Sequence, residues 1–171
     1  CHSLEPMQFE YLLKEQSIFC TGCHMVRMSA FDDVNPEHDI YPARRGQNWQ
    51  MLLPIYYKYP RYFLSEPLYG YIIYPQSMSR GDATLEQHLI RLNEHETIVL
   101  ETLKRMRMDN SVREKYLHDI RVYFSKKRFH ASVDFQDKKQ MAYQYDVLCQ
   151  LHANRNIFCK TIGKIEDLLK Q

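Results

Sequence analysis

The sequence is poor in glycine and lacks the short motifs that hold a nucleotide or a catalytic nucleophile. Its five glycines are scattered along 171 residues and form neither a phosphate-binding P-loop nor a GxGxxG turn. The nucleophile elbow GxSxG and the zinc-protease pattern HExxH are missing as well. These absences argue against nucleotide chemistry and hydrolysis, so we expect a protein that is not an enzyme and carries no cofactor.

Long hydrophobic runs are also missing. No stretch approaches the ~18 consecutive apolar residues of a transmembrane helix, whereas 44% apolar and 26% charged residues are typical of a folded domain. We therefore expect a cytoplasmic protein that does not contact a membrane. The start Cys1-His2-Ser3 shows neither an initiator Met nor a signal-peptide pattern, which favours a fragment of a longer protein over a processed lipoprotein.

Cysteine is too sparse for a disulfide scaffold. The five cysteines are an odd number, which indicates reduced thiols. Cys20-Thr-Gly-Cys23-His24 matches the CxxCH signature of haem attachment and half of a zinc site. A second cysteine pair is missing and haem attachment requires export, so we expect no bound metal and two buried cysteines on a strand. A haem protein and a zinc-stabilised nucleic-acid-binding module stay open as alternatives.

Aromatic residues, in contrast, are concentrated in residues 51–75, which hold seven of the 13 tyrosines and four of the seven prolines. Two runs within this stretch, 51–57 and 68–74, are rich in β-branched and aromatic residues and are bounded by prolines. This composition predicts strands of an antiparallel sheet, with prolines at the strand ends.

The aromatic density exceeds what a small sheet needs for its own core, and it predicts a pocket for a small-molecule ligand. Aromatic walls with a polar tip suit such ligands, and the polar loop 32–48 is long enough to cover a site. The predicted ligand-binding residues are Trp49, Tyr57, Tyr59, Tyr62 and Tyr71.

Helical patterns flank the predicted sheet. Apolar residues at helical spacing and two capping boxes, one starting at Thr84 and one at Ser111, mark the helices. The predicted elements are a helix over about 4–15, a strand within 18–31, a helix from about 84 to 108, a helix from 111, an extended stretch within 126–139, and helices over about 138–152 and 155–170.

The helix from 84 to 108 carries apolar residues at heptad positions a and d, interrupted by Glu96. This pattern is typical of a two-stranded coiled coil, so we expect a homodimer through this helix, with packing onto its own sheet as the alternative. The row consists of Leu85, Leu89, Leu92, Val99, Leu103 and Met106.

Positive charge is concentrated at the C-terminal end. Residues 1–110 hold 11 Lys and Arg against 14 Asp and Glu, whereas residues 111–171 hold 12 against 7. Two short helices in this basic part are compatible with a DNA-binding helix-turn-helix, and an ordinary helical hairpin is the alternative. The predicted nucleic-acid-binding residues are Arg155, Lys160 and Lys164.

Two stretches resemble known families. Leu52-Leu53-Pro54, followed by Pro67-Leu68-Tyr69-Gly70-Tyr71-Ile72-Ile73, is similar to a strand pair of GAF-type sensor domains in bacterial regulators. The likeness covers about residues 1–108. It implies a small antiparallel sheet flanked by helices that senses a ligand or dimerises ahead of an output domain.

The second resemblance lies in residues 152–169, which look like the last helix of the helix-turn-helix of purine-catabolism regulators. Three residues, Ile157, Lys160 and Thr161, depart from that family's pattern at positions that face DNA. The counterparts are His152, Arg155, Asn156, Lys164, Ile165, Leu168 and Leu169. This resemblance implies a DNA-binding part.

We therefore predict an α+β fold, with a small antiparallel sheet flanked by helices (GAF/PAS-like) and a helical C-terminal extension. The expected division is a sensor-like domain over 1–110 and the extension over 111–171. The expected function is that of a non-catalytic sensory or regulatory module of a bacterial signalling protein or transcription regulator. It would bind a small ligand, dimerise, or do both; a protein-interaction module or a zinc-stabilised nucleic-acid-binding module is the alternative.

Overall fold

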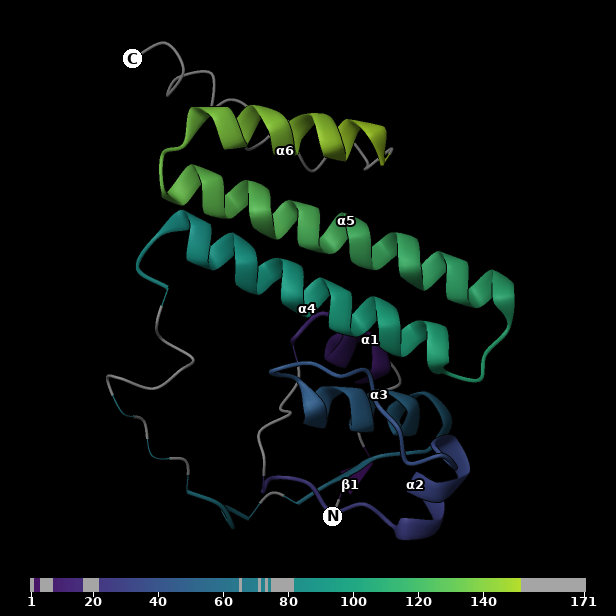
Figure 1. The fold of residues 1–171 in the computed structure, drawn as a ribbon. Helices are drawn as coiled ribbons and strands as arrows, with labels where there is room; N and C mark the ends of the chain where they lie inside the picture. The colour runs from purple at the N-terminus through teal and green to yellow at the C-terminus, as the bar shows by residue number, and fades with distance from the viewer. Residues whose placement is uncertain are drawn as a thin grey trace. The chain divides into compact units, whose positions relative to one another are not determined.

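The chain is all-α, so the predicted α+β fold is wrong. The computed structural model describes residues 2–3, 8–16, 22–64, 66–70, 72, 74 and 82–151. These residues form six helices, shown in Figure 1: α1 (Gln8–Leu13), α2 (Met28–Val34), α3 (Gln47–Lys58), α4 (Leu85–Arg105), α5 (Asn110–Asp134) and α6 (Lys138–Gln150). Strand structure in the same residues is limited to β1 (His2–Ser3) and β2 (Tyr62–Phe63), which pair antiparallel with His2 opposite Phe63.

The first of the two predicted strands is the C-terminal part of α3. Trp49, Leu52 and Leu53 recur at helical spacing and are all buried. The burial of this apolar face favours a helix and outweighs the preference of the β-branched and aromatic residues for a strand. Pro54 lies inside the helix, where its missing N–H deprives the carbonyl of residue 50 of its usual donor. The buried face stabilises the helix despite this loss. Of the second predicted strand, residues 68–70, 72 and 74 have no regular secondary structure.

Two other extended predictions are wrong in the described residues, and four helices are confirmed. Of the strand predicted within 18–31, residues 22–27 are irregular and Met28 begins α2, whereas α5 continues without a break to Asp134. Phe129 and Val133 occupy alternate positions, as in a strand, but a spacing of four also fits one face of a helix. The helices predicted near 4–15, over 84–108, from 111 and over 138–152 correspond to α1, α4, α5 and α6. The helix predicted over 155–170 lies outside the described residues.

The start of α4 has the predicted cap. The Gln87 N–H donates to Thr84 Oγ1 at 3.3 Å, and Gln87 Oε1 accepts from the Ala83 N–H at 2.9 Å. In a standard capping box, the second side chain accepts from the backbone N–H of the capping residue itself. Here Gln87 accepts instead from the N–H of Ala83, the residue before Thr84. At the start of α6, the Asp137 carboxylate accepts from the Gln140 N–H at 2.9 Å. Both helices therefore begin at a side chain that satisfies a free backbone donor.

The described chain divides into two compact units. Unit 1 comprises Cys1–Gly81 and Asn93–Ile120, and unit 2 comprises Asp82–Leu92 and Arg121–Gln171. Both α4 and α5 contribute residues to each unit. A domain boundary near residue 110 stays a prediction, because compact units reflect packing and not independent folding.

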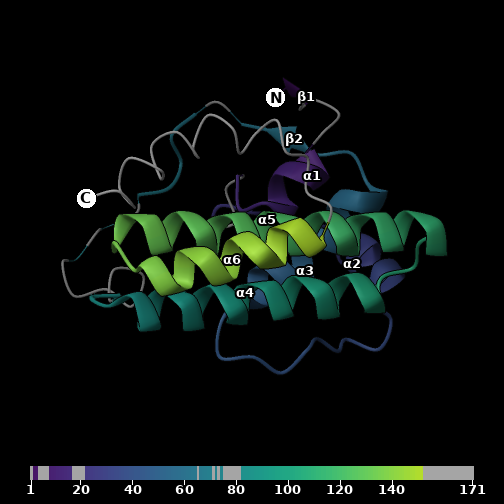
Figure 2. The same ribbon diagram turned by 90° about the horizontal axis from the view of Figure 1, so that it is seen from above.

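Unit 1 is built around α1 and α3, which pack against each other, as do α2 and α3. The Phe9 ring of α1 meets the rings of Tyr57 and Tyr116 edge-on, at centroid distances of 5.2 and 5.1 Å. Tyr116 also donates to Glu10 Oε1 at 2.7 Å; burial and this bond to a carboxylate raise the pKa of the Tyr116 phenol. The parts of α4 and α5 that belong to this unit run side by side in both views (Figures 1 and 2).

One arginine donates hydrogen bonds to backbone carbonyls at the connection between α4 and α5 in unit 1. The Arg113 guanidinium donates to the carbonyls of Leu103 at 3.3 Å, Met106 at 3.0 Å and Met108 at 3.2 Å. It also reaches Asn110 Oδ1 at 2.8 Å. The last carbonyls of a helix have no partner within the helix, so this side chain supplies the donors that the end of α4 needs.

Unit 2 has a small apolar core between α5 and α6. Phe129, Met141 and Leu148 form this buried cluster, with Val133 packed against it. The turn between the two helices contains Gln136 with a φ of 57°, a left-handed conformation that ends a helix and reverses the chain. The predicted extended stretch within 126–139 is thus the end of one helix, this turn and the start of the next.

Much of the heptad row of α4 is buried within the chain itself. Leu92, Val99, Leu103 and Met106 are all buried. A coiled coil between two copies through these residues would have to open the core that they form. These four residues therefore pack within their own chain, although not on a sheet as the alternative interpretation expected, and homodimerisation stays a prediction.

Candidate functional site

The residues predicted to line a ligand pocket have separate partners. Trp49 is 1% exposed, and its indole N–H donates to the Leu12 carbonyl at 2.7 Å. Tyr57 contacts Phe9, and Tyr59 is bonded to an aspartate described below. Tyr62 is 63% exposed. Tyr71 lies outside the described residues, as do Arg155, Lys160 and Lys164.

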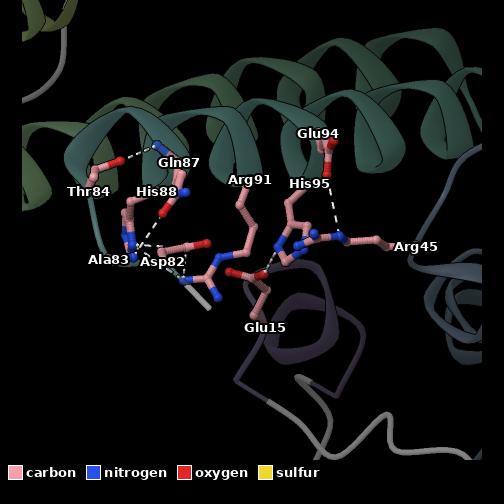
Figure 3. A network of polar contacts seen from close by, with 10 residues as sticks. All are labelled: Glu15, Arg45, Asp82, Ala83, Thr84, Gln87, His88, Arg91, Glu94 and His95. Atoms are coloured by element: carbon pink, nitrogen blue, oxygen red, sulfur yellow. Dashed lines mark hydrogen bonds and ion pairs between the residues drawn. The ribbon is translucent and has the colours of Figure 1, made fainter. Parts of the chain in front are cut away.

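A partly buried carboxylate–imidazole pair joins the residues that follow α1 to helix α4 (Figure 3). Nδ1 of His95 lies 2.5 Å from Glu15 Oε1, and both side chains are less than one quarter exposed. The His95 ring stands edge-on to Trp49 at 5.8 Å. Beside them, Arg45 and Glu94 form a longer ion pair of 3.5 Å. This cluster fixes α1, α3 and α4 of unit 1, and sequence reasoning missed it because Glu15 and His95 are 80 positions apart.

A second ion-pair cluster, in unit 2, joins Asp82, which precedes α4, to two residues in the first turns of that helix. Asp82 Oδ2 lies 2.7 Å from Arg91 Nη2 and 3.4 Å from His88 Nδ1 (Figure 3). The Asp82 side chain is 15% exposed, so its charge is balanced where solvent contributes little. Together with the Thr84 cap, these pairs hold the first turns of α4.

The third polar cluster centres on Asp33 of α2. Its Oδ2 accepts from Lys58 Nζ at 2.5 Å and from the Tyr59 hydroxyl at 2.7 Å. Both hydrogen bonds favour the charged carboxylate and lower the pKa of Asp33, with the Lys58 bond as the larger cause. The same bonds raise the pKa of Lys58 and of Tyr59. The cluster links α2 to the end of α3.

We expect Lys58→Met and Tyr59→Phe each to raise the pKa of Asp33 toward its ordinary value of 3.8. A lowered pKa in the folded state stabilises the fold above that ordinary value, and the stabilisation is lost as the pH falls through the folded-state pKa. Carbon-13 NMR of the Asp33 carboxyl against pH measures the change. Tyr62→Phe is the matched control; equal Asp33 titrations in the two tyrosine variants would contradict the role of Tyr59.

The CxxCH stretch is not a buried strand in the part that the structure describes. Cys23 is exposed and lies in an irregular segment, which corrects the expectation of two buried cysteines, while Cys20 lies outside the described residues. The His24 ring stands edge-on to Tyr56, over which Arg61 is stacked at 4.3 Å. Burial first, and the Arg61 charge second, lower the pKa of His24, so this imidazole is neutral near pH 7.

Two kinds of feature are missing from the described part of the chain. No three His, Cys, Asp or Glu side chains there converge to hold a metal ion. None of its helices has the length and apolar character needed to cross a membrane.

The largest unexplained feature is a row of exposed apolar side chains after α3, in unit 1. Tyr62, Leu64, Leu68, Ile72 and Tyr74, here called the apolar row, are all between 56 and 72% exposed. The five residues fall within thirteen positions of the chain, and Tyr69 between them is 48% exposed as well. Single exposed apolar residues are ordinary, whereas several within one short segment suggest an interaction surface.

One residue of this segment, Tyr69, lies against Gly22. A Cβ added at Gly22 would lie 2.5 Å from the Tyr69 ring, so only glycine admits this approach. Gly22 also has a φ of 90°, a conformation that favours glycine. Tyr69 is nevertheless 48% exposed, so this contact covers the ring only in part.

Comparisons with protein-family models, with curated proteins and with solved structures found no match. The two family resemblances therefore stay predictions.

Proposed function

We propose that this chain is a non-catalytic interaction module that binds a polypeptide partner through the apolar row. The observation that supports the proposal is the exposure of five large apolar side chains within thirteen positions, Tyr62, Leu64, Leu68, Ile72 and Tyr74. Fully covering one large apolar side chain contributes roughly 1.5–3 kcal/mol, so five side chains that are already partly covered give a gross gain of the same order as the entropic cost of association.

A polypeptide fits this surface better than a small ligand does. Small-molecule sites are concave and surround most of their ligand, whereas the side chains of the row are more than half exposed. Ligand sensing, the first expectation, was tied to a sheet that α3 replaces, and DNA binding was assigned to residues beyond 151. Both stay predictions.

The proposal is tested by the binding of a fluorescent apolar dye, with two matched double variants. Ile72→Glu with Tyr74→Glu changes the row, and Ile90→Glu with Tyr143→Glu changes the same residue types at exposed positions of α4 and α6. Dye fluorescence is expected to fall by roughly half or more in the row variant only. Equal fluorescence of the two variants, both folded by circular dichroism, would refute the apolar row as an accessible surface.

A further inference from the structure

The turn between α5 and α6, in unit 2, contains neither glycine nor proline and holds a strained residue. Its residues are Phe135, Gln136 and Asp137. The Gln136 N–H donates to the Val133 carbonyl at 3.0 Å, and the next N–H donates to the Ser132 carbonyl at 2.9 Å. This pair of bonds is a Schellman motif, in which the left-handed residue is usually glycine. Here that residue is Gln136, with a φ of 57°, so the turn stores backbone strain.

The same residues fit a continuous helix. In a helix that runs from α5 straight into α6, the N–H groups of Gln136 and Asp137 would donate to the carbonyls four positions before them, so neither donor loses its partner. Asp134 and Lys138 would lie one turn apart with the acidic residue first, the order that favours a pair on a helix. The bond from the Gln140 N–H to the Asp137 carboxylate would pass to a backbone carbonyl. Straightening therefore relieves the strain at Gln136 and leaves no backbone donor of the turn unsatisfied.

Few apolar contacts hold α6 on α5, and one buried side chain weakens them. The buried apolar residues of α6 are Met141 and Leu148, which form a cluster with Phe129 of α5. Gln144 lies on the same face and is 4% exposed, and its enclosed Oε1 accepts no hydrogen bond within the part of the chain that the structure describes. A buried acceptor without a donor costs free energy that is recovered when it reaches water. Gln144 therefore makes the release of α6 easier.

We infer that α6 is exchanged between two copies of this chain, so that the α6 of each copy packs on the α5 of the other. The inference does not depend on the apolar row and concerns a different surface. Exchange needs no new complementarity, because the cluster of Phe129, Met141 and Leu148 forms in the same way whether α6 belongs to the same chain or to the second copy. The exchanged dimer keeps this cluster and removes the strain at both copies of Gln136. Short connections under strain favour such exchange.

Refolding from urea at a chain concentration of about 100 µM, followed by size-exclusion chromatography with light scattering, tests the inference. The unmodified chain is expected to give a monomer and a dimer. Gln136→Gly relieves the strain of the closed turn, and a dimer contains two such turns, so the dissociation constant of the dimer is expected to rise by at least about 10-fold. Gln150→Gly makes the same change at the exposed end of α6 and is expected to dimerise like the unmodified chain. Circular dichroism confirms that each variant is folded.

A second variant tests the route by which the dimer forms. Gln144→Met keeps most of the side-chain volume and removes the buried acceptor from the closed and the exchanged form alike. The conversion between monomer and dimer, in which α6 must detach, is therefore expected to slow by about 10-fold. The fraction of dimer at equilibrium is expected to stay the same. Chromatography of the separated dimer at intervals after dilution measures the rate.

The inference is overturned by an unmodified chain that is wholly monomeric after refolding. It is also overturned by a Gln136→Gly dimer as stable as the unmodified one, or by a conversion rate that Gln144→Met leaves unchanged. A dimer through an outer surface, with each α6 kept on its own chain, predicts the last two results, because neither the strained turn nor the buried amide contributes to such a contact. The dye experiment on the apolar row keeps its meaning under each of these outcomes.

Discussion

Trp49→Ala is expected to lower the free energy of unfolding by about 3–5 kcal/mol, the range for removing a large aromatic side chain from a core. Trp49 is 1% exposed, and its ring packs between α1 and His95 of α4. Truncation leaves a cavity that the surrounding helices fill only in part. Because Trp49 is the only tryptophan, the measurement is urea unfolding followed by circular dichroism.

Trp49→Phe separates packing from hydrogen bonding. Phenylalanine keeps much of the bulk but removes one of the two donors to the Leu12 carbonyl, which still accepts from the Glu15 N–H at 3.2 Å. Losing one such hydrogen bond costs about 0.5–1.5 kcal/mol. The Phe variant is therefore expected to be less stable than the unmodified chain and more stable than the Ala variant. A loss below about 1 kcal/mol for Trp49→Ala would contradict the position of this side chain in the core.

Gly46→Ala is expected to cost about 2–4 kcal/mol, from the left-handed backbone and from overpacking. Gly46 precedes α3 with a φ of 73°, and an added Cβ would lie 3.1 Å from Cδ1 of Ile98. Ile98 is buried and has little room to move. Thermal unfolding measures the effect.

Gly70→Ala is the matched control for this glycine. Nothing lies within 4 Å of a Cβ added there, so the same change of residue type meets no neighbour. Similar melting temperatures for Gly46→Ala and Gly70→Ala would show that the close approach of Gly46 to Ile98 does not constrain the fold.

Sequence reasoning identified the helices whose apolar residues follow a clear period and missed those in which composition pointed elsewhere. α1, α4, α5 and α6 were predicted from spacing and caps, because these signals are local. In α3, Pro54 and a β-type composition concealed the helical spacing of Trp49, Leu52 and Leu53. The prediction gave the strand propensity of the residue types, which is a weak indicator, more weight than the helical spacing of the apolar residues.

Contacts between distant parts of the chain were not predictable in the same way. The bond from Trp49 to the Leu12 carbonyl spans 37 positions, and the pair of Glu15 with His95 spans 80. No local pattern signals either one, because both depend on how helices pack. The apolar row was different: Tyr62 was selected from the sequence, but as the wall of a pocket and not as an exposed side chain.

The contacts of Arg113 limit where this chain can be cut or lengthened. One guanidinium satisfies carbonyls of Leu103, Met106 and Met108, so its position depends on the length of the short connection that follows α4. Residues inserted there would move the arginine away from the end of the helix and leave three acceptors to be satisfied by water. A circular permutant opened at this turn would lose the same contacts, although turns between helices are usually the places that tolerate such changes.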